Sequence, residues 1–203
     1  MIAIVDYNMG NLASVQNAFA KLGCQTVVES DPQKFHLYDK LILPGVGAFG
    51  DAMEHLKERN MIEAIQEYAA SGKYMLGICL GMQLLFDSSE EFGKHEGLGL
   101  IKGTVTHFNS ENFQENMKIP HMGWNRMFTK VHPLFEGLDE AHYLYFVHTY
   151  HVNCENEEDI IGTTHYGYDF TSAVAHNNIF GIQPHPEKSH ENGLKILENF
   201  ISL

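Results

Sequence analysis

One cysteine of this sequence lies in a setting that could make it a nucleophile. Cys79 stands in the run Gly77-Ile-Cys-Leu-Gly81, after the apolar segment 74–78 and before a helical pattern that starts at Leu80. This pattern is typical of a nucleophile elbow, in which a strand turns sharply into a helix and flanking glycines leave room for a strained backbone. The positive end of the helix dipole would favour a thiolate, and the Leu80 N–H could donate to an oxyanion. The alternative is a buried structural cysteine.

A base for this cysteine is indicated by the run Gln183-Pro-His-Pro-Glu187. Each proline favours extended geometry in the residue before it, and side chains two apart in an extended chain project to the same side. His185 and Glu187 can therefore converge, so that the carboxylate fixes the imidazole tautomer while the imidazole reaches the thiol. Alone, the run would indicate a rigid surface turn, but together with Cys79 it predicts a Cys-His-Glu triad.

The run Gly45-Val-Gly-Ala-Phe-Gly50 has three interpretations. It matches the G-x-G-x-x-G of a dinucleotide site, but the first strand-to-helix turn lacks this fingerprint. The acidic residue that such a site needs about 20 positions on would also fall inside a helical pattern, near Ala70 and Ser71. The other interpretations are a tight turn that needs glycine for geometry alone, and a turn whose backbone N–H groups face a developing oxyanion.

The remaining cysteines and histidines predict no second site. Cys24 and Cys154 are interpreted as structural. His148 and His151 would suggest a metal site only on a helix, and their segment has the aromatic pattern of a strand. We therefore expect no metal and no cofactor. Surface positions are expected for most of the other histidines, among them His36, His55 and His95.

The charge balance excludes one broad class of protein. Against 26 Asp and Glu there are 13 Lys and Arg, so the 203 residues carry a net charge of −13 at pH 7, which argues against binding to a nucleic-acid backbone. Protonation of all 13 histidines would bring the sum to zero, so the charge is sensitive to pH just below neutrality. The 44% of hydrophobic residues suffice for one core, and the 19% of charged residues argue against disorder.

We expect neither a signal peptide nor a membrane span. The first six residues lack a basic region, and the longest apolar stretch, 74–86, is shorter than the ~20 residues that a span needs. Three cysteines without C-x-x-C spacing indicate neither a disulfide framework nor a zinc knuckle. The expectation is a cytoplasmic protein with free thiols.

The elements that must position these residues alternate in the first half of the chain. Such alternation predicts a parallel sheet with helices on both faces. Strands are predicted at 2–5, 27–28, 40–43 and 74–78, and helices at 12–22, at 48–71 in two pieces broken near Asn60, and at 80–86.

The second half of the chain is richer in aromatic and β-branched residues. This composition favours strands that add to the same sheet in mixed or antiparallel order. The strand patterns lie at 104–112, 143–152, 160–165, 173–176 and 179–183, and a last helical pattern lies at 192–201.

Three motifs, in this order along the chain, resemble those of the class I glutamine amidotransferases. They are Pro44-Gly-Val-Gly47, Gly77-Ile-Cys-Leu-Gly-Met-Gln83 and His185-Pro-Glu-Lys-Ser189. The resemblance covers the whole chain and implies one amidotransferase domain over residues 1–203. It also implies an α/β, flavodoxin-like three-layer sandwich: a central, mostly parallel sheet, helices on both faces and extra antiparallel strands in the C-terminal half.

Three further segments are similar to one branch of this family, the glutaminase subunits of imidazole glycerol phosphate synthase in histidine biosynthesis. They are Asp6-Tyr-Asn-Met-Gly-Asn-Leu12, Pro120-His-Met-Gly-Trp-Asn125 and Tyr145-Phe-Val-His-Thr-Tyr150. The alternatives are a paralogous glutaminase that feeds a synthase amidating surface sugars, a cysteine peptidase or amidohydrolase, and a non-catalytic interaction subunit of the same fold.

The family resemblance implies a reaction. Cys79 attacks the side-chain amide of glutamine, backbone N–H groups of Leu80 and of Val46-Gly47 hold the oxyanion, and His185 protonates the departing ammonia. Water activated by His185 then cleaves the glutamyl thioester, and glutamate leaves.

The resemblance also implies contacts to the glutamine head group from Gly47, Gln83, Glu91, Thr149 and Tyr150. A carboxylate suits an α-ammonium group, and backbone donors suit an α-carboxylate. The alternatives are a solvated surface charge for Glu91 and an ordinary polar helix position for Gln83.

A partner is implied as well: a (β/α)8-barrel synthase that forms a heterodimer with this chain and consumes the ammonia. No nucleic acid or membrane is expected as a partner. For Trp124, the only tryptophan, an interface anchor is one interpretation and core packing the other. The residues at or near the docking face would be His121, Met122, Trp124, Tyr145 and Lys188.

The sequence departs from the family pattern at Pro184, where phenylalanine generally precedes the His-Pro-Glu run. A ring near the thiol is thereby lost, so we expect the glutamine pocket or its coupling to the partner to differ from the family pattern.

Overall fold

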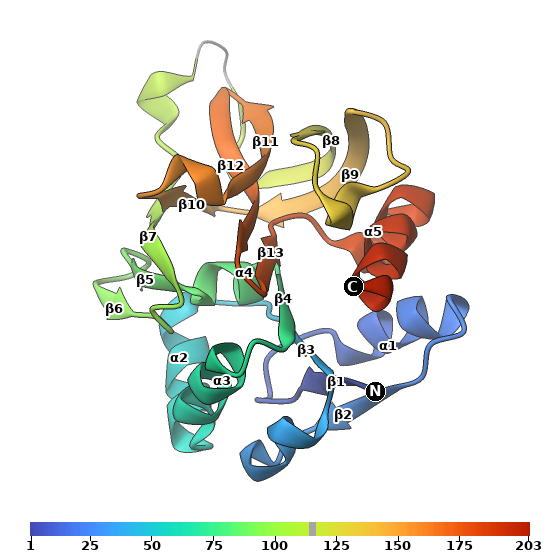
Figure 1. Ribbon diagram of the computed structural model, residues 1–203. Coiled ribbons are helices and arrows are strands. Elements are labelled where there is room, and N and C mark those ends of the chain that lie inside the picture. The colour runs from blue at the N-terminus through green and yellow to red at the C-terminus, as the bar shows by residue number, and fades with distance from the viewer. Residues whose placement is uncertain (114–116) are drawn as a thin grey trace.

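The computed structural model describes residues 1–113 and 117–203. In this part of the chain thirteen strands form one sheet, most of them in the order β2-β1-β3-β4-β13-β12-β10-β7-β5-β6 (Figure 1). A branch leaves this path, in which β11 pairs with β12 and β8, and β9 pairs with β8. Because β13 lies between β4 and β12, the two halves of the chain share one sheet.

Five parallel strands make up the first part of this sheet. Alternate residues face opposite sides, so Ala3 and Val5 belong to one core cluster while Ile2 and Ile4 belong to the other. Burial on both faces explains why these strands are continuous apolar runs in the sequence. The strands are β1 (Ile2–Val5), β2 (Thr26–Glu29), β3 (Lys40–Leu43), β4 (Tyr74–Ile78) and β13 (Ile179–Ile182).

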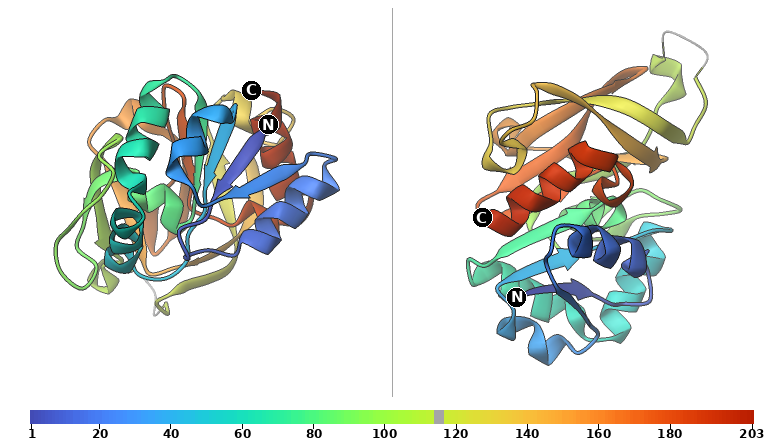
Figure 2. Two further views of the ribbon diagram at one scale, coloured as in Figure 1. Left: turned by 90° about the horizontal axis from the view of Figure 1, so that it is seen from below. Right: turned by 90° about the vertical axis from the view of Figure 1, so that its right-hand side faces the viewer.

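Helices cover both faces of the parallel strands, as Figure 2 shows. α2 (Phe49–Glu58) and α3 (Met61–Ala70) pack on one face, and α1 (Leu12–Lys21) and α5 (His190–Ser202) pack on the other. The predicted three-layer arrangement is thus confirmed. None of the helices in the described residues is long and apolar enough to cross a membrane.

Antiparallel pairs dominate the second part of the sheet, as expected from its composition. Its strands are β5 (Phe86–Ser89), β6 (His95–Glu96), β7 (Ile101–His107), β8 (His121–Thr129), β9 (Ala141–His148), β10 (Tyr150–Cys154), β11 (Ile160–Tyr166) and β12 (Tyr168–His176). The short helices are α4 (Leu80–Leu84) and the 3-10 turns η1 (Pro32–Leu37), η2 (Ser110–Asn112), η3 (Pro133–Phe135), η4 (Glu157–Asp159) and η5 (Pro186–Lys188).

Several element boundaries differ from those predicted. The helix expected over 80–86 ends at Leu84, because the carbonyl groups of residues 84–86 accept hydrogen bonds from residues 98–101 instead of continuing the helix. The strand pattern at 104–112 ends at His107, and the one at 143–152 is interrupted at Thr149. β8 has no counterpart among the predicted strands.

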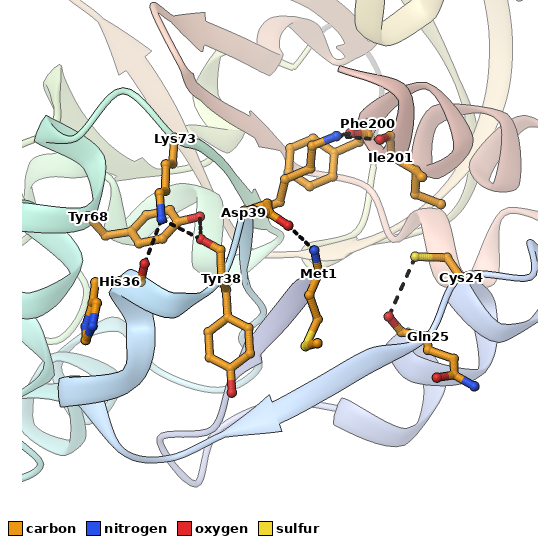
Figure 3. Close-up of polar contacts among 11 residues, drawn as sticks. Met1, Cys24, Gln25, His36, Tyr38, Asp39, Tyr68, Lys73, Phe200 and Ile201 are labelled. Atoms are coloured by element: carbon orange, nitrogen blue, oxygen red, sulfur yellow. Dashed lines mark hydrogen bonds and ion pairs between the residues drawn. The ribbon is translucent and has the colours of Figure 1, made fainter.

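The amino ends of the parallel strands are tied to their neighbours by hydrogen bonds to backbone carbonyl groups (Figure 3). Lys73 Nζ donates to the carbonyl oxygens of His36 and Tyr38 at 2.7 and 3.0 Å. Lys40 Nζ donates to the carbonyl oxygen of Phe200 at 3.0 Å and also to that of Ile201, both near the end of α5. The carboxyl ends of these strands lie at the opposite end of the sheet. In open α/β sheets, ligands bind at the carboxyl ends of the strands.

Candidate active site

Cys79 lies at the turn between β4 and α4 with an unusual backbone conformation. Its φ of 55° and ψ of −112° place it in a region that residues other than glycine seldom adopt. Gly77 and Gly81 leave the turn its room: a Cβ on Gly81 would lie 1.8 Å from the Leu43 carbonyl oxygen, and one on Gly77 would lie 2.6 Å from the Gly81 carbonyl oxygen. The strand-turn-helix geometry of a nucleophile elbow is therefore present, with Cys79 at its apex.

His185 and Glu187 form a buried pair at the start of η5, across from the elbow. Nδ1 of His185 lies 2.8 Å from Oε1 of Glu187, and the two side chains are only 4% and 2% exposed. The backbone N–H of His185 donates to the Tyr145 carbonyl oxygen at 2.8 Å, which anchors the extended segment to β9. Nε2 of His185 is buried and has no hydrogen-bond partner among the described residues, so it is free for a reacting group.

The charges around His185 favour its protonated form. Burial disfavours the imidazolium, but the negative charge of a Cys79 thiolate and the hydrogen-bonded carboxylate of Glu187 outweigh it and raise the pKa of His185 to about 10. At neutral pH the imidazole therefore carries a proton that it can give to a leaving group.

One cavity of about 250 Å³ brings the predicted residues together. Cys79 and His185 line it along with every residue predicted for the oxyanion site or the glutamine head group, whereas Glu187 stands behind His185. The lining residues are Val46, Gly47, Cys79, Leu80, Gln83, Glu91, Val147, His148, Thr149, Tyr150 and His185.

Glu91 is buried at this cavity, so the interpretation as a solvated surface charge is wrong. Its Oε2 accepts a hydrogen bond from the Phe49 backbone N–H, at the start of α2, at 2.7 Å. Burial raises the pKa of this carboxyl against the opposing hydrogen bond from Phe49. A carboxylate in this position can bind an ammonium group that enters the cavity.

Two glutamines connect the wall of the cavity to the thiol. Nε2 of Gln83 donates to the Tyr150 carbonyl oxygen and to Oε1 of Gln183, both at 3.0 Å, so Gln83 is not an ordinary polar helix position. Nε2 of Gln183 donates to Sγ of Cys79 at 3.7 Å. Gln183 was not among the predicted site residues, although a polar residue directly after a buried strand was a signal for it.

The glycine-rich turn after β3 borders the same cavity. Val46 is 43% exposed, and Gly47 has a φ of 99°, which suits glycine. The turn rests on Tyr7, whose buried hydroxyl donates to the Pro44 carbonyl oxygen at 2.7 Å. A Cβ on Gly45 would lie 2.6 Å from that hydroxyl. Tyr7 was also missed, because nothing in its local sequence indicates a contact 37 residues away.

The residues predicted for the docking face divide between surface and interior. Met122 and Trp124 are 62% and 46% exposed on β8, so core packing is the wrong interpretation for Trp124. The Trp124 ring stacks on His190 with the centroids 5.0 Å apart, and Tyr145 packs beside it. Lys188 Nζ lies 6.0 Å from the centre of the Tyr145 ring. His121, by contrast, is only 2% exposed and points inwards.

The histidines are less exposed than expected. Of the three named as surface positions, His36 is exposed, whereas His55 and His95 are half-buried. Strands β8, β9 and β10 turn four further histidines into the core, where most were expected at the surface. Among residues 1–113 and 117–203, no group of three or more His, Cys, Asp and Glu side chains is placed to hold a metal ion. The four buried histidines besides His185 are His121, His142, His148 and His151.

Comparison with known proteins gives a family match over nearly the full chain. Residues 3–203 match the family model described as Glutamine amidotransferase class-I. Two relatives are both named "Imidazole glycerol phosphate synthase subunit HisH". The one from Sulfurimonas denitrificans is 79% identical, over 98% of this chain and 97% of its own length. The one from Wolinella succinogenes is 55% identical over the full length of both chains.

Solved structures of the same fold are more distant in sequence. A chain in "Structure of PurLQS from Thermotoga maritima" has a TM-score of 0.77 at 19% identity and covers 99% of this chain, with 97% of its own length matched. A chain in "Crystal structure of glutamine amidotransferase" has a TM-score of 0.75 at 16% identity, over 98% of each chain. These similarities concern the fold.

Proposed function

The chain belongs to the class I glutamine amidotransferase family, and from this we propose that it is the glutaminase subunit of imidazole glycerol phosphate synthase in histidine biosynthesis. The observation that carries the catalytic part of the proposal is the convergence of Cys79 and the His185–Glu187 pair on one small cavity beside the Gly47 turn. The relatives' name supports the pathway.

In the proposed reaction the Cys79 thiolate attacks the side-chain amide carbon of glutamine. The Leu80 N–H and the Val46-Gly47 turn hold the oxyanion, and the proton on His185 goes to the leaving ammonia. His185 is then neutral and takes a proton from the water that attacks the thioester. The C–S bond breaks, glutamate leaves, and the thiolate and imidazolium are restored.

The head group of glutamine would be held at the other end of the cavity. Glu91 faces the position proposed for the α-ammonium group, and the Thr149–Tyr150 corner and Gln83 form the adjoining wall. Gly47, without a side chain, leaves its backbone open to the α-carboxylate. This arrangement supports the selection of free glutamine over a glutamine inside a peptide, because the α-nitrogen of an internal residue is in an amide bond and offers no ammonium group to Glu91.

A subunit implies a second subunit, which we propose to be a (β/α)8-barrel synthase. It would add the ammonia to a phosphoribulosyl-formimino aminoimidazole carboxamide ribotide and form imidazole glycerol phosphate and AICAR. The proposed docking face consists of Met122, Trp124, Tyr145 and Lys188, with His121 beneath it. We also propose a cytoplasmic location, which the biosynthetic role of the relatives supports.

Replacing Cys79 with alanine tests this proposal in a mixture with the barrel synthase. Glutamine-dependent synthesis by Cys79→Ala should fall at least about a thousandfold, because the nucleophile is lost. Synthesis from added ammonia should survive, and Cys24→Ala should behave like the unchanged chain. Glutamine use by Cys79→Ala would contradict the nucleophile, and glutamine use only with a sugar-amidating synthase would contradict the pathway.

A further inference from the structure

A chain of hydrogen bonds runs from the docking strand β8 to the wall of the cavity. Nδ2 of Asn125 lies 3.1 Å from Nε2 of His121. Nδ1 of His121 lies 2.9 Å from Nε2 of His148. Nδ1 of His148 lies 2.8 Å from the carbonyl oxygen of Tyr150. Three side chains thus connect the strand that carries Trp124 with a residue that lines the site.

The partners at the two ends determine the direction of every bond in this chain. A carbonyl oxygen can only accept, so His148 carries a proton on Nδ1 and its Nε2 is an acceptor. His121 must then donate through its own Nδ1, which leaves its Nε2 to accept from the amide N–H of Asn125. Burial supports this neutral state, since it lowers the pKa of His121 to about 4 and that of His148 well below its usual range.

The packing around His121 holds its ring in the orientation that the chain needs. The ring stacks against Tyr166 with the centroids 4.0 Å apart, and against Phe146 at 4.7 Å. Planar contacts on both faces prevent the ring from tilting, so Nδ1 stays directed at His148. The bond is therefore a fixed connection between β8 and β9 in the interior.

The carbonyl oxygen of Tyr150 is where this chain meets the catalytic residues. It also accepts from Nε2 of Gln83 at 3.0 Å, and Gln83 continues through Gln183 to Sγ of Cys79. His148 itself lines the cavity next to Thr149. A shift in His121 would therefore reach the Thr149–Tyr150 corner without passing through solvent.

We propose that His121 and His148 are positioning residues, which hold the Thr149–Tyr150 corner of the glutamine pocket in place from the docking strand β8. The inference rests on the proposed function, because it assigns the corner to glutamine. Neither histidine touches the reacting atoms in this account. Because head-group contacts act on substrate and transition state alike, a looser corner affects KM for glutamine more than kcat.

A pair of variants of similar shape tests the proposal in the complex with the barrel synthase. His121→Leu removes both ring nitrogens and so both hydrogen bonds of the ring. It should raise KM for glutamine about three- to tenfold with kcat within about twofold, as expected when the buried bond to His148, which leads to the pocket, is lost. His121→Asn keeps an amide N–H near the position of Nδ1, so its KM for glutamine should lie close to that of the unchanged protein. An unchanged KM in a folded His121→Leu protein would overturn the proposal.

His151→Leu is the matched control. His151 is also buried, and like His121 it packs against the ring of Phe108, but it stands outside the chain of bonds. Its KM for glutamine should equal that of the unchanged protein. An equal rise in KM for His151→Leu would show that any cavity in this cluster loosens the pocket, and would overturn the specific role of His121.

A measurement on the unchanged protein needs neither a variant nor a reaction. Imidazole ¹⁵N chemical shifts report which ring nitrogen carries the proton, and both His121 and His148 should be neutral with the proton on Nδ1. A proton on Nε2 of either histidine would be incompatible with the donor and acceptor order of these hydrogen bonds and would overturn the inference. If the complex uses no glutamine, the proposed function fails, and these shifts still decide whether the chain of bonds exists.

Discussion

Two histidines beside one cavity show how surroundings set the chemistry of a single residue type. His185 has the carboxylate of Glu187 at 2.8 Å and the thiol of Cys79 nearby, and its pKa is raised to about 10. His148 is surrounded by aromatic rings and by other histidines, and burial lowers its pKa well below the usual range. His185 can therefore donate a proton at neutral pH, whereas His148 stays neutral and serves as a fixed hydrogen-bonding group.

The charge of Glu187 should matter to the reaction through His185. In Glu187→Gln the negative charge is lost and the amide can present either oxygen or nitrogen to Nδ1, so the imidazole loses its fixed orientation and its pKa falls. We expect kcat for glutamine-driven synthesis in the complex to drop at least about a hundredfold. Steady-state kinetics with glutamine and with added ammonia measure this.

The exposed Glu191 of α5 provides a control with the same change of charge. Glu191→Gln should leave glutamine-driven synthesis as it is. A Glu187→Gln protein with normal glutamine turnover would remove Glu187 from the triad.

At the scale of elements, the paired strands β8 and β9 form a ribbon with two different faces. Residues of β8 alternate, so His121 and Met127 point into the core while Met122, Trp124 and Phe128 are exposed. The register sets Trp124 opposite Tyr145 of β9. Because strand side chains alternate, one ribbon can present a docking surface on one face and support the pocket from the other.

The docking role that we propose for this ribbon can be separated from its structural role. Trp124→Ala should weaken association with the barrel synthase by about 2 kcal/mol or more, as for a central aromatic anchor, while the free energy of unfolding changes less. Isothermal titration gives the first quantity and denaturant unfolding the second.

Phe128 offers a close comparison, since it is also 46% exposed and lies four residues further along the same face of β8. Phe128→Ala should weaken docking much less, because it lies outside the proposed face. If both variants bind the partner as well as the unchanged chain, the proposed docking face is wrong.

At the scale of the whole molecule, the net charge of −13 does not describe the proposed docking face. Lys188 lies on that face and Arg126 lies next to it on β8, where its guanidinium packs on the rings of Phe128 and Tyr143. By itself, a net charge of this sign would favour a neutral to basic partner surface. The local cations instead favour acidic groups where the partner meets this ribbon.

The buried histidines should make the fold sensitive to mild acid. His121, His142, His148 and His151 have pKa values lowered by burial, so the native state binds fewer protons than the unfolded chain once the pH falls below about 6.5. Stability should therefore decrease from about pH 6.5 down to about pH 4, where His121 titrates in the folded state. Each histidine that stays neutral in the folded state lowers the free energy of unfolding by up to about 1.4 kcal/mol for each pH unit in this range.

Denaturant unfolding at several pH values between 7 and 4.5 measures this slope. His142→Leu removes one such histidine away from the cavity, and its free energy of unfolding should depend less steeply on pH. A slope that is the same in both proteins would show that the native state protonates His142 without cost.

Most residues of the candidate site were predicted from local sequence motifs. The elbow around Cys79, the His185–Glu187 spacing and the glycine turn are each set by a few adjacent residues, because the backbone conformations they require depend on glycine and proline within the motif. The amphipathic helices and the buried parallel strands follow from short-range periodicity in the same way.

Contacts between distant segments were decided by the tertiary structure. Gln83 and Gln183 are 100 residues apart, and Tyr7 and Pro44 are 37 apart, so no local pattern reveals either contact. The inward direction of His121 depends on how β8 pairs with β9 and β11, and a slip of one residue would expose it. The residues of the proposed reaction were thus predicted from the sequence itself, whereas what holds them in place depends on strand pairing, which only the folded chain establishes.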